Sequence, residues 1–362
     1  MGRFRRKWVT NARESAAVSG CGLDTEDLAF HTARRPPFEP ELGAILASFP
    51  AETRASVTPE SISAIRRSIA DRTPSREDIE KTGVVVDEVE APGLGHETVS
   101  LSVFRHQVTA DLRPCIYFIH GGGMIAGSRM LRADALAELV LDLGVVVVSV
   151  EYRLAPEHPF PAGVDDCYAG LLWIEEHAAQ YGIDLEYLIV HGVSAGGGLA
   201  AATALLARDR SGPRITHQIL QGPMLDDRNT SASSFELDTD SPWNRTSNIT
   251  GWAALLGSEA GGPDTSPYAA PARATNLSGL PHTYIDVGQV EVFRDEAIDF
   301  AARLSRCGVP VELHVWPGAW HGFDYSASHA ALSQLSNHTR RAFIERAIAS
   351  SPEMPPAVLR SA

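Results

Sequence analysis

A serine between two glycines, in the run Gly-Val-Ser-Ala-Gly at 192–196, is the strongest chemical signal in the chain. A short apolar run at 188–190 precedes it and an alanine- and leucine-rich run follows it to 207, so Ser194 lies where a strand passes into a helix. This context predicts a nucleophile elbow, a strained turn that exposes the serine hydroxyl beside a helix N-terminus. The alternative is a helix start whose small residues only pack tightly.

Three glycines follow His120, directly after an apolar run at 115–119. Glycines leave backbone N–H groups uncovered, so a ligand can approach them. We therefore predict that the N–H groups of Gly121, Gly122 and Ala195 bind a developing oxyanion. The alternative is a flexible turn. We expect His120 to hydrogen-bond locally and shape this loop rather than act as a base.

A serine hydroxyl is a poor nucleophile at neutral pH and needs a base. His321, in the run Trp-His-Gly-Phe, follows the last expected strand and can reach the strand ends where the elbow lies. The chain has 13 histidines, so a lone one is usually structural. The position of His321 late in the chain and the glycine after it favour it as the base.

A carboxylate that orients the histidine should follow the strand expected at 283–287. Four acidic residues lie in that interval: Asp286, Glu291, Asp295 and Glu296. Asp286 falls inside the strand, and Asp295 and Glu296 begin a helix, where acidic residues are common. Glu291 lies in the intervening loop, so we predict that it is the third member of a triad.

The elements that must position these residues alternate along the chain. Expected strands lie at 84–86, 99–103, 115–119, 145–150, 188–190, 219–220, 283–287 and 311–315. Expected helices lie at 60–70, 130–142, 163–180, 194–207, 293–306 and 327–349. Short apolar strands that alternate with helices predict an α/β fold, with a mostly parallel central sheet covered by helices on both faces.

A polar segment at 226–275 interrupts this alternation, and we expect it to form a helical cap over the sheet. The predicted division is an N-terminal region at 1–80 that contributes to the cap, a first core part at 81–225, the cap at 226–275, a second core part at 276–350 and a tail at 351–362. Trp243 and Trp252 in the cap either line a pocket or form cap core, and we favour cap core.

The composition limits the partners. Of 362 residues, 31 are Lys or Arg and 45 are Asp or Glu, which gives a net charge of −14 and disfavours nucleic acid. We expect a small-molecule substrate.

No apolar run is long enough to span a bilayer, and no apolar signal segment follows the basic start. Four scattered cysteines form no zinc-type pair and suit a reducing compartment, so we predict no metal and a cytoplasmic location.

Over residues 80–345 the chain resembles the hormone-sensitive-lipase-like esterases, a branch of the α/β-hydrolase fold. The motifs that carry the resemblance are His-Gly-Gly-Gly at 120–123, Tyr-Arg-Leu-Ala-Pro-Glu-His-Pro-Phe-Pro-Ala at 152–162, the elbow, Phe-Arg-Asp-Glu at 293–296 and His-Gly-Phe at 321–323. The order Ser194, Glu291, His321 is that of the fold. Glu291 stands where the family usually has Asp, and Val193 where it has Asp or Thr.

The resemblance implies an ester hydrolase without metal or organic cofactor, and it implies that Glu157 and His158 are structural. We predict a serine carboxylic ester hydrolase that acts on small, short-to-medium acyl esters. The alternatives are a lactone, amide or carbamate hydrolase with the same triad, or a non-catalytic small-molecule receptor of the same fold, which His321 disfavours because such receptors replace it. Relatives often pair through the last strand and helix, which implies a homodimer.

Overall fold

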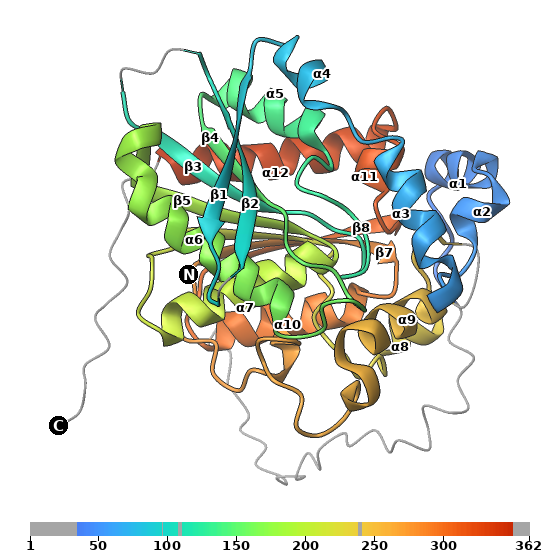
Figure 1. Ribbon diagram of the computed structural model, residues 1–362. Coiled ribbons are helices and arrows are strands. Elements are labelled where there is room, and N and C mark those ends of the chain that lie inside the picture. The colour runs from blue at the N-terminus through green and yellow to red at the C-terminus, as the bar shows by residue number, and fades with distance from the viewer. Residues whose placement is uncertain (1–34, 96, 108–110, 238–240, 350–362) are drawn as a thin grey trace, which may run out of the picture. The chain divides into compact units, whose positions relative to one another are not determined.

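The structure is a computed structural model that describes residues 35–95, 97–107, 111–237 and 241–349 (Figure 1). The first 34 residues of the predicted N-terminal region, and the predicted tail at 351–362, lie outside the described residues.

In the described ranges eight strands form one sheet in the order β1-β2-β4-β3-β5-β6-β7-β8. Their bounds are β1 (Val85–Pro92), β2 (Thr98–Arg105), β3 (Arg113–Ile119), β4 (Val146–Val150), β5 (Ile183–Val193), β6 (His217–Gln221), β7 (His282–Val290) and β8 (Val311–Trp320). β2 pairs antiparallel with β1 and with β4, and the other neighbours pair parallel. The predicted, mostly parallel sheet is confirmed.

Helices cover both faces of this sheet (Figure 1). One face carries α5 (Ala133–Leu143) and α12 (Ala331–Ala349), and the other carries α6 (Ala162–Tyr181), α7 (Ala195–Asp209) and α10 (Arg294–Arg306). Side chains of a strand point alternately to the two faces. On β3, Ile116 and Phe118 therefore pack in the α5 and α12 core, whereas Tyr117 packs in the opposite core.

The described residues before β1 and the polar segment at 226–275 form mostly short helices, and Val57 joins the two segments. These helices are α1 (Pro40–Ser48), α2 (Ala51–Arg54), η2 (Pro59–Ser61), α3 (Ile62–Ala70), α8 (Ala232–Phe235), α9 (Arg245–Leu256), η3 (Gly257–Glu259) and η4 (Pro271–Arg273), with α4 (Arg76–Glu80) leading into β1. Val57 N–H donates to Ser247 Oγ at 2.9 Å, and Thr250 Oγ1 donates to Val57 O at 2.8 Å. Two segments far apart in sequence are thereby joined.

Element boundaries near the end of the chain differ from those that the apolar pattern predicts. β8 continues to Trp320, because its last residue still pairs with Val290 of β7 beyond a register shift. A separate turn, α11 (Phe323–Ser326), then intervenes, so α12 begins at Ala331 rather than at 327. His321 consequently lies in a tight connection between a strand end and a helical turn.

Candidate active site

The predicted elbow lies at the junction of β5 and α7. Ser194 has φ 57° and ψ −121°, a conformation that residues other than glycine rarely adopt. A Cβ on Gly192 would lie 2.0 Å from Gly196 O, and a Cβ on Gly196 would lie 2.1 Å from Ile119 O. Both positions therefore require glycine, because strand, turn and helix approach each other too closely for any side chain.

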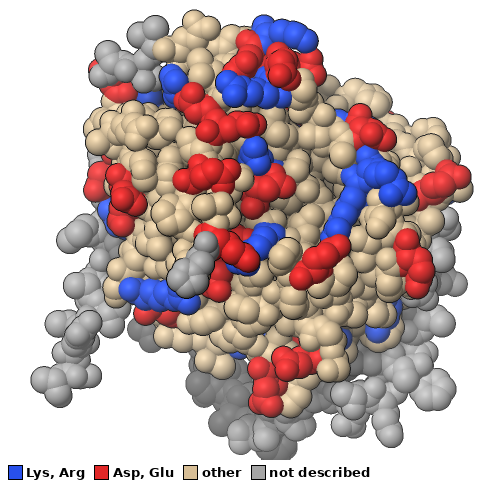
Figure 2. Space-filling model, in the orientation of Figure 1, with Lys and Arg blue, Asp and Glu red and all other residues tan. Residues whose placement is uncertain are grey.

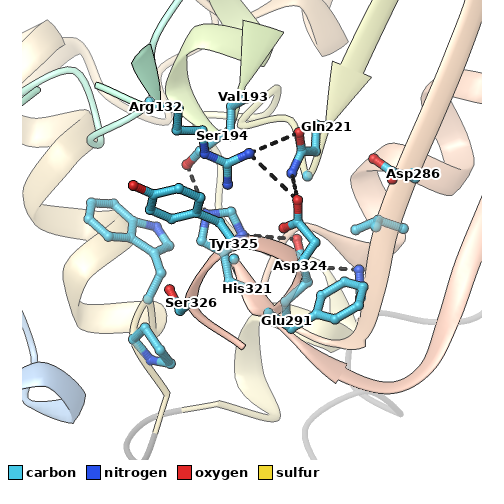
Figure 3. A pocket seen from close by; sticks show the side chains of 18 of the residues that line it. Arg132, Val193, Ser194, Gln221, Asp286, Glu291, His321, Asp324, Tyr325 and Ser326 are labelled. Carbon is cyan, nitrogen blue, oxygen red and sulfur yellow. Dashed lines mark hydrogen bonds and ion pairs between the residues drawn. The ribbon is translucent and has the colours of Figure 1, made fainter. Parts of the chain in front are cut away.

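His321 connects this serine to a carboxylate (Figure 3). His321 Nε2 lies 2.9 Å from Ser194 Oγ, and Nδ1 lies 3.2 Å from Glu291 Oε1. Glu291 is buried in the loop after β7, and its other oxygen accepts a hydrogen bond from Gly288 N–H at 3.0 Å. The arrangement can transfer a proton from the serine to the histidine while the carboxylate holds the ring.

The structure brings one of the four acidic candidates to the histidine, and that one is Glu291. The other three have partners elsewhere: Asp286 pairs with Arg340, Asp295 accepts a hydrogen bond from Ser233 N–H, and Glu296 accepts one from Leu225 N–H. Burial raises the pKa of Glu296 well above its usual value. None of these three carboxylates has a recorded hydrogen bond to His321 in the described part of the chain.

The glycine loop after β3 lies directly against the elbow. A Cβ on Gly121 would lie 2.9 Å from Val193 O and 3.2 Å from Ser194 Cβ. Gly122 has φ 119°, which favours glycine there. Ala195 is the first residue of α7, so its N–H has no partner within the helix. The loop and the helix start thus meet beside the serine hydroxyl, where an oxyanion would form.

His120 is buried inside this loop. Its ring stacks on Tyr152 at 4.1 Å between centroids, and its Nδ1 lies 2.8 Å from Gly121 O. Burial lowers the pKa of His120 to about 4, so the ring is neutral near neutral pH. These contacts fit the local, shape-giving role expected from the sequence.

The serine and histidine open into a pocket of about 260 Å³. Trp243 lines it and lies so close to the glycine loop that a Cβ on Gly123 would be 2.2 Å from the indole ring. Trp252 is 1% exposed and lies in the core. Trp252 is therefore a core residue, whereas Trp243 both packs in the core and forms a wall of the pocket.

Several polar residues that the sequence did not single out line the same pocket, among them Arg132, Gln221, Asp324 and Tyr325 (Figure 3). Two of them could have been proposed from the sequence, because Gln221 ends a parallel strand and Asp324 follows His321 by three residues. Arg132 carried none, since nothing in its neighbourhood announces that its backbone turns to φ 66° and brings it to the pocket.

Glu157 and His158 are not part of the pocket lining. The exposed Glu157 carboxylate binds the Arg66 guanidinium at 2.7 and 2.8 Å, and this hydrogen bonding lowers the pKa of Glu157 to about 2. Within the described ranges, no three His, Cys, Asp or Glu side chains gather so that they could hold a metal ion. Among the helices described, none has both the length and the apolar character to cross a membrane.

Comparison with known proteins agrees with this architecture. A family model described as alpha/beta hydrolase fold matches residues 116–325. Esterase LipI of Mycobacterium tuberculosis is 32% identical over 84% of this chain and 93% of its own length. Carboxylesterase NlhH of the same species is 34% identical over 81% of this chain and 90% of its own length. A solved bacterial heroin esterase is 38% identical, with a TM-score of 0.80 over 87% of this chain and 99% of that chain.

The chain belongs to the α/β-hydrolase fold family, in its hormone-sensitive-lipase-like branch. It is an enzyme of the carboxylesterase class. The fold class and the enzyme class predicted from the sequence are thereby confirmed.

Proposed function

We propose that the enzyme hydrolyses small carboxylic esters with Ser194 as nucleophile, His321 as general base and acid, and Glu291 as the carboxylate that orients the histidine. The observation that carries this proposal is the continuous contact from hydroxyl to imidazole to buried carboxylate, at 2.9 and 3.2 Å. A single histidine that contacts a serine with one nitrogen and a carboxylate with the other has the geometry of a hydrolytic triad.

In the first half of the reaction, Ser194 Oγ attacks the ester carbonyl carbon and its proton passes to His321 Nε2. The oxyanion accepts hydrogen bonds from the N–H groups of Gly121, Gly122 and Ala195. His321 then gives the proton to the leaving oxygen, the carbon–oxygen bond breaks, and the alcohol departs. In the second half, water attacks the acyl-enzyme, His321 takes a proton from it, and the same histidine returns a proton to Ser194 as the acid leaves. Glu291 holds the imidazole ring and stabilises the imidazolium.

The pocket favours short-to-medium acyl groups. Its volume is about 260 Å³, and Trp243 closes it above the glycine loop. On the face seen in Figure 2, acidic and basic side chains are interspersed, and the chain carries a net charge of −14. These charges do not repel an uncharged ester, whereas the net charge disfavours polyanions such as nucleic acid.

The nucleophile is tested by Ser194→Ala. We expect ester turnover to fall by about 10⁶-fold, by analogy with loss of the serine in other triads. Hydrolysis of 4-nitrophenyl esters of graded chain length, beside a lactone and an anilide, measures both the loss and the bond preference. A fluorophosphonate should label the wild type once and leave Ser194→Ala unlabelled. Labelling that persists in the variant would remove Ser194 from the mechanism.

Three further features of the protein extend this proposal. We propose that 1–80 and 226–275 together form the cap and that 81–225 and 276–350 form the catalytic core; the contacts of Val57 with α9 support the joining of the two cap segments.

β8 is an edge strand of the sheet, which supports a homodimer through β8 and α12 that light scattering would detect. The cytoplasmic location stays a prediction, which cell fractionation tests.

A further inference from the structure

One glutamine at the end of β6 joins the serine to the histidine turn by a second route. The backbone carbonyl of Gln221 accepts the Ser194 N–H at 2.8 Å. Its side-chain Nε2 donates to Asp324 Oδ2 at 2.6 Å, and Asp324 lies three residues after His321 in α11. Through this one residue the backbone of the elbow and the turn that carries the histidine hold each other in place.

Asp324 continues into a buried network of charges. Its Oδ2 lies 3.2 Å from Arg340 Nη2 and 3.5 Å from Arg132 Nη1. Arg340, from α12, is itself buried and contacts Asp286 of β7 at 3.1 Å. Burial alone would raise the pKa of Asp324, but the two arginines hold it below its usual value. Two cations and two anions thus balance each other in the wall of the pocket.

Gly222, which follows Gln221 at the end of β6, connects this network of charges to the triad a second time. Gly222 N–H donates to the carbonyl of Asp286 at 2.7 Å. A Cβ on Gly222, which has φ 49°, would lie 3.2 Å from both Glu291 Oε1 and His321 Cε1. A side chain at position 222 would therefore press on both of these groups, so the end of β6 lies directly against the two side chains.

A buried ion-pair network contributes little net stability, because the cost of desolvation offsets the Coulomb attraction. What such a network does supply is fixed geometry and a fixed local charge. The groups fixed here are the backbone of Ser194, the turn after His321 and the strand before Glu291. The network is therefore placed to act on the reaction and not only on the fold.

We propose that Gln221, Asp324, Arg340 and Asp286 are positioning residues, which set the approach of His321 to Ser194 and the charge that the imidazolium experiences. This inference rests on the ester-hydrolase function proposed above and deepens it. All four side chains line the pocket, but the proposed role does not depend on contact with the substrate. They act through the histidine turn and through the strand ends that carry the other two members of the triad.

The charge around His321 comes from several elements, which together decide the sign of each effect. Asp324 lies in the turn that follows His321. The other titratable and charged groups near His321 come from neighbouring elements: Glu291 and Asp286 from β7 and the loop after it, Arg340 from α12, Arg132 from just before α5, His191 from β5, and Tyr325 from α11. Burial lowers the pKa of His191 to about 3, so it stays neutral. Removal of one charged side chain therefore changes the net charge around His321 by one unit of known sign.

Asp324→Asn keeps the side-chain shape and removes one negative charge. We expect kcat to fall by about 10²-fold, as for a misplacement of about 1 Å, while KM changes little. The imidazolium loses a stabilising charge, so the acid limb of the kcat/KM profile moves to lower pH. A unit charge on the order of 10 Å away shifts such a limb by about one pH unit at an effective dielectric constant of about 20.

Arg340→Met removes a positive charge and should move the acid limb to higher pH, opposite to Asp324→Asn. Arg340→Lys restores the charge without the planar fork, so the limb should return while part of the kcat loss remains. Gln221→Met removes the contact with Asp324 but no charge, and it should lower kcat with the limb unmoved. The matched control is Arg341→Met, on the same helix, where Arg341 forms exposed ion pairs with Asp142 and Glu345.

If the acid limb moves in opposite directions in Asp324→Asn and Arg340→Met and does not move in Arg341→Met, the proposal is supported. A purely structural role gives no such reversal of sign. If Arg340→Met does not fold, as judged by Tm, then Asp324→Asn and Gln221→Met decide. If their kcat and pH profiles match those of Arg341→Met, the positioning role is refuted. Should Ser194→Ala retain activity or fluorophosphonate labelling, the triad itself fails, which separates that failure from the failure of this inference.

Discussion

The two sides of the pocket are built by different means. On the core side, the elbow and the glycine loop are fixed by backbone contacts so close that Gly192 and Gly196 admit no side chain. On the cap side, side-chain amides fix Trp243: its Nε1 donates to Asn248 Oδ1 at 3.3 Å, and Asn248 Nδ2 donates to Asn229 at 3.1 Å. Backbone contacts thus hold the elbow and the glycine loop, and side-chain hydrogen bonds hold Trp243, which we propose limits substrate size.

This difference follows from what each side must do. Proton transfer and oxyanion binding require positions held to within a fraction of an ångström. A wall that selects acyl length tolerates more movement, because one methylene in an apolar pocket changes binding by only about 1–3 kcal/mol. Changes on the core side should therefore abolish turnover, whereas changes on the cap side should alter preference or stability.

The largest effect on the core side, after loss of the serine, should come from Glu291→Gln. We expect kcat to fall by about 10⁴-fold at unchanged Tm, because the imidazole loses the carboxylate that holds its tautomer. Glu291→Asp should recover part of the rate, limited by the missing methylene. Asp295→Asn is the control, since Asp295 binds Ser233 and Arg294 rather than His321. A severe loss in Asp295→Asn with near-normal Glu291→Gln would show that the third member is misassigned.

Gly123→Ala tests the contact between the two sides of the pocket, where the glycine loop lies against Trp243. Its new Cβ would lie 2.2 Å from the Trp243 ring, at a backbone φ of 65°. We expect kcat/KM for 4-nitrophenyl acetate to fall by about 10- to 10²-fold, as the oxyanion loop is pushed off its position. The double variant Gly123→Ala/Trp243→Ala should regain part of that loss and accept longer acyl chains.

Gly308→Ala is the matched control for this test. Gly308 also has a positive φ, of 78°, but nothing lies within 4 Å of a Cβ there. It should cost about 1–2 kcal/mol of stability, as expected for a left-handed residue, and leave kcat/KM unchanged. If the double variant is no better than Gly123→Ala, contact with Trp243 is not what holds the loop.

The smallest effect should come from Ser247→Ala on the cap side. This variant removes the hydrogen bond that Val57 N–H donates to Ser247 Oγ, and leaves a buried donor without its partner. We expect the free energy of unfolding to fall by about 1–3 kcal/mol, with kcat for short esters within about threefold of wild type. Thermal melts beside a 4-nitrophenyl acetate assay measure both. A large loss of kcat would mean that the cap also positions the catalytic groups.

Local sequence predicted the backbone features of the core side. The elbow, the glycine loop and the alternation of strands and helices are short-range patterns, and the parallel sheet follows from that alternation. Glu291 could be favoured over Asp286 because a residue inside a strand and one just after it project differently. Element boundaries were less certain: the register shift that extends β8 to Trp320 depends on its pairing with β7, which lies about 30 residues away along the chain.

Only the tertiary structure decided which side chains from distant segments meet. Asp324, Arg340 and Asp286 come from three elements, and no local pattern says that their charges cancel in one buried cluster. The same is true of Trp243, whose place against Gly123 depends on how the segment at 226–275 folds back onto the sheet. The reason is physical: glycine turns and strand periodicity arise from neighbours along the chain, whereas ion pairing and pocket size arise from neighbours in space.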